Sequence, residues 1–346
     1  MKIKSLGPLL LTLTIGVCGS IAATKANLPA AALVGAILAV SLGSMFRITV
    51  DIPLGLRNIA FAIIGCSLGS GITKEALSQT GQWPFSLVVL GVAVFLTMLT
   101  CSWVLSRFFS QTVETAMLAT SPGALAYSLA LAAGGMGDIQ AIIVIQNIRL
   151  LAVTTLLPFI LDNFGFEMGH TGTQAAIGGT GSVVVILIAI LVGLSVSRWK
   201  IPASFLIIGM LVSGIGHYMG LVIGRPPNAI IFAGFAVTGA MVGARFSSIP
   251  LSDLKRLLLA SLSAVLISGL FSIMFAFPVA RFLDVPFGQV FVAFAPGGVE
   301  AMAAMALALG YDPAYVATHH LFRILLLFFL LPMGVKILKK MKTQQH

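Results

Sequence analysis

The chain has 346 residues, of which 58% are hydrophobic and only 9% are charged, and its mean hydropathy is +1.07. Soluble domains carry about 25% charged residues, so this composition excludes a soluble globular protein and predicts a polytopic membrane protein. The formal net charge of +10 does not indicate nucleic-acid binding, because Lys and Arg stand singly in loops and at the C-terminus and form no basic face.

Polar or Gly/Pro breaks divide the chain into twelve apolar segments, each near the roughly 20 residues that a membrane span requires. The six of the first half are 6–24, 28–46, 53–72, 84–107, 113–135 and 139–161, and six more follow in the same order from 180 to 337. The first segment also has the features of a cleaved signal peptide. We prefer a retained span, because residues 180–198 duplicate it inside the chain.

A shift of 174 residues, the separation of Gly19 and Gly193, brings the two halves into register. The other matched positions are Gly35 and Gly209, Gly65 and Gly239, Gly69 and Gly243, Pro122-Gly123 and Pro296-Gly297, Asp138 and Asp312, Arg149 and Arg323, and Pro158 and Pro332. A lipid-facing sequence has little reason to match such residues by chance. The sequence therefore predicts a membrane repeat at 1–165, a periplasmic linker at 166–179 and a second membrane repeat at 180–346.

Loop charges orient these segments. Lysines near both termini predict cytoplasmic ends, while the connection 162–180 contains Asp162 and Glu167 but no Lys or Arg and is expected outside. Each half must then cross the membrane an odd number of times, so one of its six segments does not cross. The fifth segment, which is interrupted by "SPGA" in the first half and by "APGG" in the second, is the one that we expect not to cross the membrane. This parity predicts an inverted repeat, the architecture common among secondary transporters.

Two glycine motifs stand at equivalent positions of the third segments, "GCSLG" at 65–69 and "GAMVG" at 239–243. The GxxxG spacing lets two helix backbones approach closely, which favours helix packing over ligand contact as their role.

The fifth segments contain the Pro-Gly sequences that are predicted to interrupt them. Proline removes a backbone donor and glycine relaxes the helix, so breaks are expected at Pro122-Gly123 and at Pro296, Gly297 and Gly298. The freed backbone groups must line a cavity enclosed by protein, and the positive N-terminus of each following half-helix points into it. A simple proline kink is the alternative reading of either motif alone.

Arg149 and Arg323 lie near the middle of the sixth segments, where an unpaired charge is costly. They are expected either to bind a substrate or to be static partners of the carbonyls freed at the breaks. Glu300 is the only acid in the middle of a segment and cannot neutralise both arginines. The remaining positive charge predicts a small anion, such as a carboxylate, as the ligand. Glu300 itself is expected either to carry a coupling proton or to pair with Arg323.

Other polar residues near the arginines complete the predicted substrate site. Gln146 and His320 stand at matched positions one turn before Arg149 and Arg323. His319 and His320 are about 100° apart on a helix and cannot hold one metal ion together, so polar packing is the simpler reading. Asp138 and Asp312 are expected to cap the sixth helices. The cysteines, Cys18, Cys66 and Cys101, are read as packing residues.

The segments "SPGALAYSLALAAGGMGDIQAIIVIQNIRLL" and "APGGVEAMAAMALALGYDPAYVATHHLFRILL" resemble the duplicated membrane module of the AbrB family of Gram-negative bacteria. The resemblance covers essentially the whole chain and is carried by Pro122, Gly123, Asp138, Arg149, Pro296, Gly297, Gly298, Glu300, Met302, Asp312 and Arg323. The first half departs from the pattern at Ala124 and lacks the Glu-Met. The resemblance implies a regulator of gene expression or a transporter. This family is distinct from the small DNA-binding transition-state regulator of the same name.

The sequence thus predicts an all-α polytopic protein of the bacterial inner membrane with 10–12 hydrophobic segments in two pseudo-symmetric, inverted repeats with Pro-Gly-broken helices. The expected function is secondary transport of a small anion with indirect effects on gene expression. The alternatives are a membrane sensor that does not transport and a passive helper subunit. No catalytic motif, cofactor site or metal site is recognised, and no nucleic-acid partner is expected. The lipid bilayer is the expected environment. The sequence does not define the substrate, the coupling ion, the direction of transport or self-association. It also allows the fifth segments to be either re-entrant or broken spans.

Overall fold

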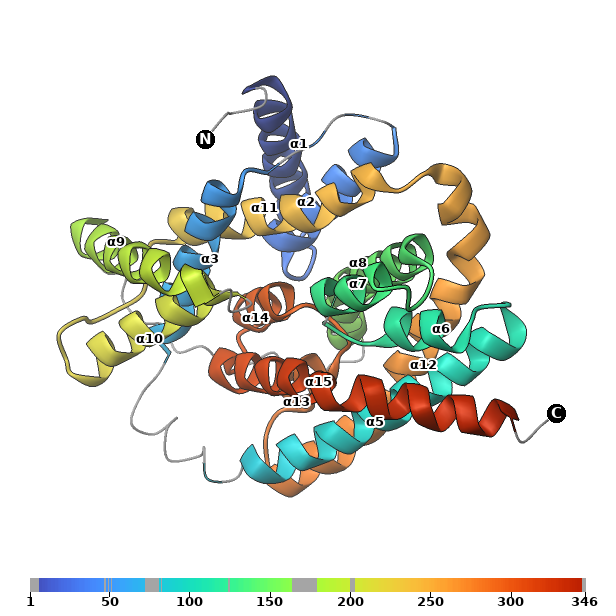
Figure 1. Cartoon of the computed structure of the whole chain (residues 1–346). Coiled ribbons are helices and arrows are strands. Elements are labelled where there is room, and N and C mark those ends of the chain that lie inside the picture. Colours follow the sequence, from blue (N-terminus) through green and yellow to red (C-terminus); the bar gives the residue numbers. More distant parts are fainter. Residues whose placement is uncertain are drawn as a thin grey trace. The chain divides into compact units, whose positions relative to one another are not determined.

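The computed structural model describes residues 6–46, 48, 50, 52–71, 81, 83–123, 125–163, 179–199 and 203–343. In these residues the regular structure consists of fourteen α-helices and two short 3₁₀-helices, η2 (Ser197–Trp199) and η3 (Arg245–Ser248). The predicted all-α class is therefore confirmed for the described part of the chain (Figure 1). Nearly all of the predicted linker, 166–178, and the lysines at positions 2 and 4 lie outside the described residues, as do the side chains beyond residue 334.

Within the described ranges, seven helices are long and apolar enough to cross a membrane, which supports a multi-pass membrane protein. These candidate spans are 7–25, 83–108, 139–163, 181–199, 228–248, 251–283 and 313–334. Four further apolar helices are shorter, at Ala31–Met45, Leu54–Gly69, Ser204–Tyr218 and Val299–Ala308.

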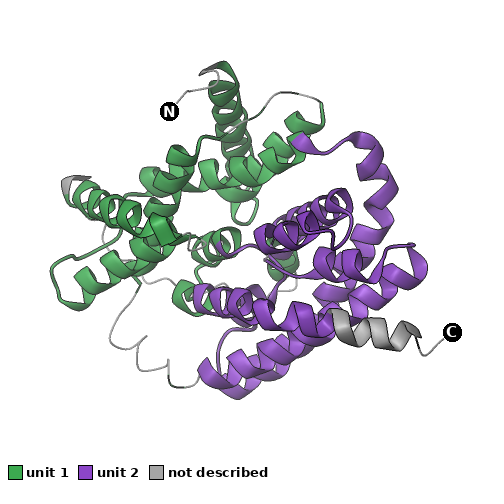
Figure 2. Cartoon of the chain, in the orientation of Figure 1, with its two compact units in different colours: residues 1–81, 158–247, 300–316 green, residues 82–157, 248–299, 317–346 purple. Residues whose placement is uncertain are grey.

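The chain forms two compact units, and each unit takes segments from both halves of the sequence (Figure 2). Unit 1 consists of residues 1–81, 158–247 and 300–316, and unit 2 of residues 82–157, 248–299 and 317–346. The predicted repeats at 1–165 and 180–346 are stretches of sequence, whereas the two units are groups of packed helices drawn from both stretches.

The described residues of unit 1 form seven helices, and the first residue of one of them, α14, belongs to unit 2. They are α1 (Leu6–Lys25), α2 (Ala31–Met45), α3 (Leu54–Gly69), α9 (Gly179–Val196), α10 (Ser204–Tyr218), α11 (Asn228–Ala244) and α14 (Val299–Ala308). Helix α3 packs on α10, and α11 packs on α2.

The GxxxG motifs lie in these two helix contacts. A Cβ atom on Gly69 would stand 2.7 Å from the Gly214 nitrogen of α10, and one on Gly239 would stand 2.5 Å from the Leu33 oxygen of α2. Real Cβ atoms do not approach backbone this closely, so only glycine permits these contacts. The predicted packing role of both motifs is confirmed.

Unit 2 contains the helices that carry the Pro-Gly sequences and the two buried arginines. They are α5 (Trp83–Phe108), α6 (Val113–Thr120), α7 (Leu125–Ala133), α8 (Ile139–Asn163), α12 (Leu251–Leu283), α13 (Phe287–Phe294) and α15 (Pro313–Thr343). The last turns of α8, from Pro158, and the first turn of α15, to Val316, belong to unit 1.

The cysteines differ in their surroundings. Cys66 and Cys101 are buried and free, and Cys66 packs in an apolar cluster with Ala62, Val185, Ile186 and Ala189. Cys18 is exposed, so the prediction that it is a packing residue is wrong. Periodicity could not reveal this, because both faces of α1 are apolar and the side that meets other helices is set by tertiary structure.

Candidate functional site

Each Pro-Gly sequence ends a helix where it was predicted to. A residue that precedes proline is disfavoured in the α conformation, and Ser121 and Ala295 are both extended, with φ and ψ of −63° and 118° and of −59° and 140°. Helix α6 consequently ends at Thr120 and α13 at Phe294. Gly123 then adopts a positive φ of 79° in the turn that precedes α7.

A broken helix leaves its last carbonyl groups without amide partners, and in the membrane interior these groups need other donors. Arg149 of α8 supplies them at the end of α6. Its Nη1 donates to the Thr120 oxygen at 2.8 Å and to the Ala119 oxygen at 3.4 Å, and its Nη2 donates to the Ser121 oxygen at 3.0 Å. Gln146 Nε2 donates to the Leu118 oxygen at 2.8 Å and approaches Ser121 Oγ at 3.5 Å.

The second break has the same construction. Arg323 Nη1 donates to the Ala295 oxygen at 2.7 Å, and its Nη2 donates to the Gly297 oxygen. His320 Nε2 lies 3.0 Å from the oxygen of Val292, the residue 174 positions after Leu118. Each break is therefore held by an arginine and by the polar residue one turn before it. Gly298 is the last residue before α14.

Both guanidinium groups are buried and lie within electrostatic range of one another. Arg149 is 3% exposed and Arg323 is 0% exposed, and their charges act on one another. The partners that the structure gives them in unit 2 are main-chain oxygens and His320 Nδ1, which lies 2.7 Å from Arg323 Nη2; no carboxylate is among them. Both Nε atoms are buried and have no hydrogen-bond partner among the described residues. The site thus combines two positive charges with two N–H groups that could still donate.

The two breaks lie against each other at Gly123. A Cβ atom on Gly123 would stand 3.1 Å from Arg323 Nη2 and 3.3 Å from the Gly297 oxygen. The first break, which Arg149 holds, therefore contacts the arginine that holds the second. Unit 2 by itself brings together Pro122, Gly123, Gln146, Arg149, Pro296, Gly297, His320 and Arg323 from the predicted set.

Replacing Gly123 by alanine is expected to lower the thermal stability of the protein by about 1–3 kcal/mol. The positive φ strains any L side chain by about 1 kcal/mol, and the new methyl group would also press on the Arg323 guanidinium. Thermal unfolding of the purified protein in detergent measures the loss.

Gly135→Ala is the matched control, because Gly135 has a φ of 90° but open space where a Cβ would stand. The difference between the two variants reports the crowding at Arg323. Equal losses in Gly123→Ala and Gly135→Ala would contradict the close approach of the two breaks.

Glu300 belongs to unit 1, where its charge acts on Arg245 at the end of α11, and Arg245 also lies within electrostatic range of Arg57. The sequence analysis assigned no role in a site to Arg57 or Arg245. No motif connects them to Glu300, because neither arginine has a counterpart in the other half, so the sequence offered no signal for this cluster.

Asp138 and Asp312 cap the sixth helices as predicted. Asp138 Oδ1 accepts from the Gln140 amide at 2.9 Å, and Asp312 Oδ1 accepts from the Ala314 amide at 2.9 Å. Burial raises the pKa of the Asp312 carboxyl, and its bonds to the Tyr315 and Ala314 amides oppose this. Each aspartate thus defines the start of a helix, α8 or α15, whose later turns place Arg149 or Arg323 at a helix break.

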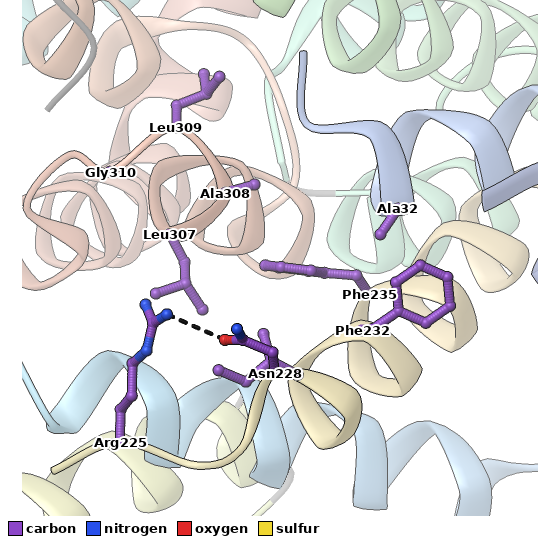
Figure 3. Close-up of a pocket in the computed structure, with 10 residues that line it drawn as sticks. Ala32, Arg225, Asn228, Phe232, Phe235, Leu307, Ala308, Leu309 and Gly310 are labelled. Carbon is purple, nitrogen blue, oxygen red and sulfur yellow. Dashed lines mark hydrogen bonds between the residues drawn. The ribbon is translucent and has the colours of Figure 1, made fainter. Parts of the chain in front are cut away.

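Unit 1 contains a separate, open pocket of about 430 Å³ (Figure 3). Arg225 and Asn228 are its polar side chains, and Arg225 Nη2 donates to Asn228 Oδ1 at 3.0 Å. Phe232, Phe235 and Leu307 are among its apolar lining. This pocket offers one guanidinium group that already has a side-chain partner, so the paired arginines of unit 2 are the stronger candidate for binding an anion.

Residues 32–339 match the sequence model of a family described as "Transition state regulatory protein AbrB". Two curated relatives are similar over most of their length. "Putative regulator AbrB" of Escherichia coli (strain K12) is 26% identical over 323 residues, which are 89% of this chain and 90% of the relative. "Uncharacterized protein YhjN" of Bacillus subtilis (strain 168) is 23% identical over 296 residues, which are 80% of this chain and 77% of the relative. The resemblance that the Pro-Gly, Asp and Arg pattern indicated is confirmed.

Proposed function

The chain belongs to the AbrB family, and from this premise we propose that it is a secondary transporter of a small anion, with the paired arginines of unit 2 as the binding site. The observation that carries the proposal is the burial of Arg149 and Arg323 within electrostatic range of one another, with main-chain oxygens and a histidine as their hydrogen-bond partners. Carbonyl dipoles solvate a guanidinium group but do not cancel its charge. An anion would do so, and its oxygens would be acceptors for the two Nε atoms.

The arginines have two roles in this proposal. Their Nη atoms satisfy the carbonyl groups that the breaks expose, which is the static role that the sequence also allowed, and their remaining charge attracts the substrate. Broken helices that meet at a charged centre are the form that binding sites take in many secondary transporters.

We further propose that the two halves are inverted repeats in the inner membrane of a bacterium. The packing pattern supports the repeat, because exchanging the halves turns the pair α3 and α10 into the pair α11 and α2. The same exchange turns α5 and α6 into α12 and α13, and α1 and α11 into α9 and α3. A cysteine introduced between residues 166 and 178 should react with impermeant thiol reagents from the periplasm, and labelling from the cytoplasm alone would contradict the inversion.

The binding site is tested by thermal unfolding of the purified protein in detergent with sodium salts of pyruvate, oxalate and phosphate. An anion at 100 times its dissociation constant is expected to stabilise the protein by about 2.7 kcal/mol. Glucose and choline serve as a neutral and a cationic control. Uptake of any stabilising anion, carrying a radioactive label, is then measured in proteoliposomes with and without the protein.

Stabilisation together with protein-dependent uptake would support the proposal. If none of the three anions stabilises the protein, the anion site is wrong.

A membrane sensor is the second candidate function, because a relative with 26% identity has the printed name "Putative regulator AbrB". A sensor would bind the anion at the same arginines without moving it across the membrane. Stabilisation without uptake in proteoliposomes would favour this function over transport.

A further inference from the structure

The two breaks differ in one chemical respect, the polar residue one turn before each arginine. Gln146 and His320 donate to matched carbonyl groups, those of Leu118 and Val292. Only the histidine also contacts its arginine, through Nδ1 at 2.7 Å from Arg323 Nη2. In the described part of the chain, His320 is thus a titratable side chain hydrogen-bonded to an arginine of the proposed anion site, and the matching position of the other half is Gln146.

The partners of His320 define its protonation state. A guanidinium group only donates hydrogen bonds, so Nδ1 must be the acceptor from Arg323. A carbonyl oxygen only accepts, so Nε2 must carry the hydrogen that points at Val292. His320 is accordingly neutral, with its proton on Nε2, and its side chain is 0% exposed.

Adding a proton to Nδ1 would be incompatible with this arrangement. Two N–H groups and two positive charges would then face each other at a distance suited to one hydrogen bond. The conflict is removed when an anion draws the Arg323 guanidinium away or lies between the two groups, because its negative charge offsets one of the two positive charges. An anion at Arg323 and a proton on His320 therefore favour one another, and the preference must be reciprocal.

The charged and titratable groups around His320 reinforce this coupling. On its own helix these are Arg323 and His319, and across the site Arg149 of α8 acts on Arg323. Helix α13 contributes the Val292 carbonyl group, and Ser86 of α5 contacts His319 Nε2 at 2.7 Å. No carboxylate is among the groups that the structure gives as acting on His320. The negative charge that would favour a second cation must therefore come from the substrate.

We propose that His320 is the proton-binding residue of the transporter, so that one proton is carried together with each anion. This inference rests on the proposed function, because it requires an anion at Arg323. The proton is taken up at Nδ1 as the hydrogen bond from Arg323 Nη2 is lost, and it leaves when the anion departs and that bond forms again. Histidine suits such a step, because its unperturbed pKa lies near neutral pH.

The test compares the pH dependence of anion affinity in three proteins: the wild type, His320→Gln and His319→Gln. Pyruvate and oxalate are the probes, because their charge does not change between pH 6 and 8. Apparent affinity is obtained from thermal unfolding over a range of probe concentrations. Gln146 already forms the matching hydrogen bond in the first half, so His320→Gln keeps the contact to Val292 but removes the titratable nitrogen.

In the wild type, affinity is expected to fall by about tenfold per pH unit as the pH rises, since each binding event takes up one proton. His320→Gln should bind with an affinity that does not depend on pH. His319→Gln should keep the slope of the wild type. A slope that persists in His320→Gln would overturn the proposal and leave the anion site intact. If the wild type binds neither pyruvate nor oxalate, the proton coupling is overturned, and if it also fails to bind phosphate, the anion site is overturned with it.

Proton uptake by the wild type provides a readout that does not depend on any variant folding. Adding pyruvate or oxalate to the protein in weakly buffered detergent should make the solution more alkaline, by about one proton per bound anion, as followed with a pH-sensitive dye. Binding with no proton uptake would contradict the role of His320.

Discussion

Arg323→Gln is expected to unfold at a markedly lower temperature than the wild type and to lose stabilisation by anions. The substitution leaves the carbonyl groups of Ala295 and Gly297 without the donors that Arg323 supplies. Hydrogen bonds to a charged group each contribute about 1.5–3 kcal/mol, so the loss should be about 3 kcal/mol or more. Thermal unfolding in detergent measures the stability, and the anion series described above measures the binding.

Three further variants separate the two roles of the arginine. Arg149→Gln should behave like Arg323→Gln, because Arg149 holds the other break. Arg323→Lys keeps the charge but cannot reach both carbonyl groups with a planar fork, so it should lose stability and retain weak anion binding. Arg225→Gln is the control from the pocket of unit 1 and should leave anion binding unchanged.

The pattern of results decides between the sites. If Arg225→Gln abolishes anion stabilisation while Arg323→Gln keeps it, the anion binds in the pocket of unit 1. If Arg323→Gln and Arg149→Gln only lower the unfolding temperature and still bind anions as the wild type does, the arginines are purely structural.

Gly65→Ala is expected to destabilise the protein by about 2 kcal/mol or more, although a single methyl group is added. The Cβ would collide with the main chain of α10, at the Leu206 oxygen and at 3.1 Å from the Gly209 Cα. Overpacking of this kind costs about 1–3 kcal/mol even where flexible side chains can adjust, and here the obstacle is backbone. If the new methyl group separated α3 from α10, the neighbouring contacts between these two helices would also be weakened. Thermal unfolding is again the measurement.

Gly55→Ala is the matched control on the same helix, because nothing lies within 4 Å of the position of its Cβ. This substitution should be neutral or stabilise the protein by up to about 1 kcal/mol, as alanine favours helix. Should Gly65→Ala prove as stable as Gly55→Ala, the close packing of α3 on α10 would be refuted.

Local chemistry made several features readable from the sequence. Proline constrains the residue before it wherever it occurs, so the ends of α6 and α13 followed from Pro122 and Pro296 alone. The recurrence of glycine at a spacing of four in both halves indicated close helix packing, since no other residue permits such an approach. The cost of a charge in an apolar span singled out Arg149 and Arg323.

Other features depended on how distant segments meet. The sequence left open whether the arginines would face carboxylates, carbonyl groups or a ligand, because that choice depends on which helix packs against which. In unit 2, α8 lies at the end of α6 and α15 at the end of α13, so the arginines donate to carbonyl groups. The same contacts determined that His320 accepts from Arg323, which no periodicity could indicate.

The sequence by itself thus determined the class of the protein, the positions of the helix breaks and the two arginines whose charge is costly inside a membrane. These follow from the composition and from constraints between neighbouring residues. Tertiary structure alone decided the partners of the charged groups, bringing Arg323 to the second break in unit 2 and Glu300 into range of Arg245 in unit 1. Partner choice is a property of packing, because a buried charge is stabilised by whichever dipoles and charges the fold brings within a few ångströms of it.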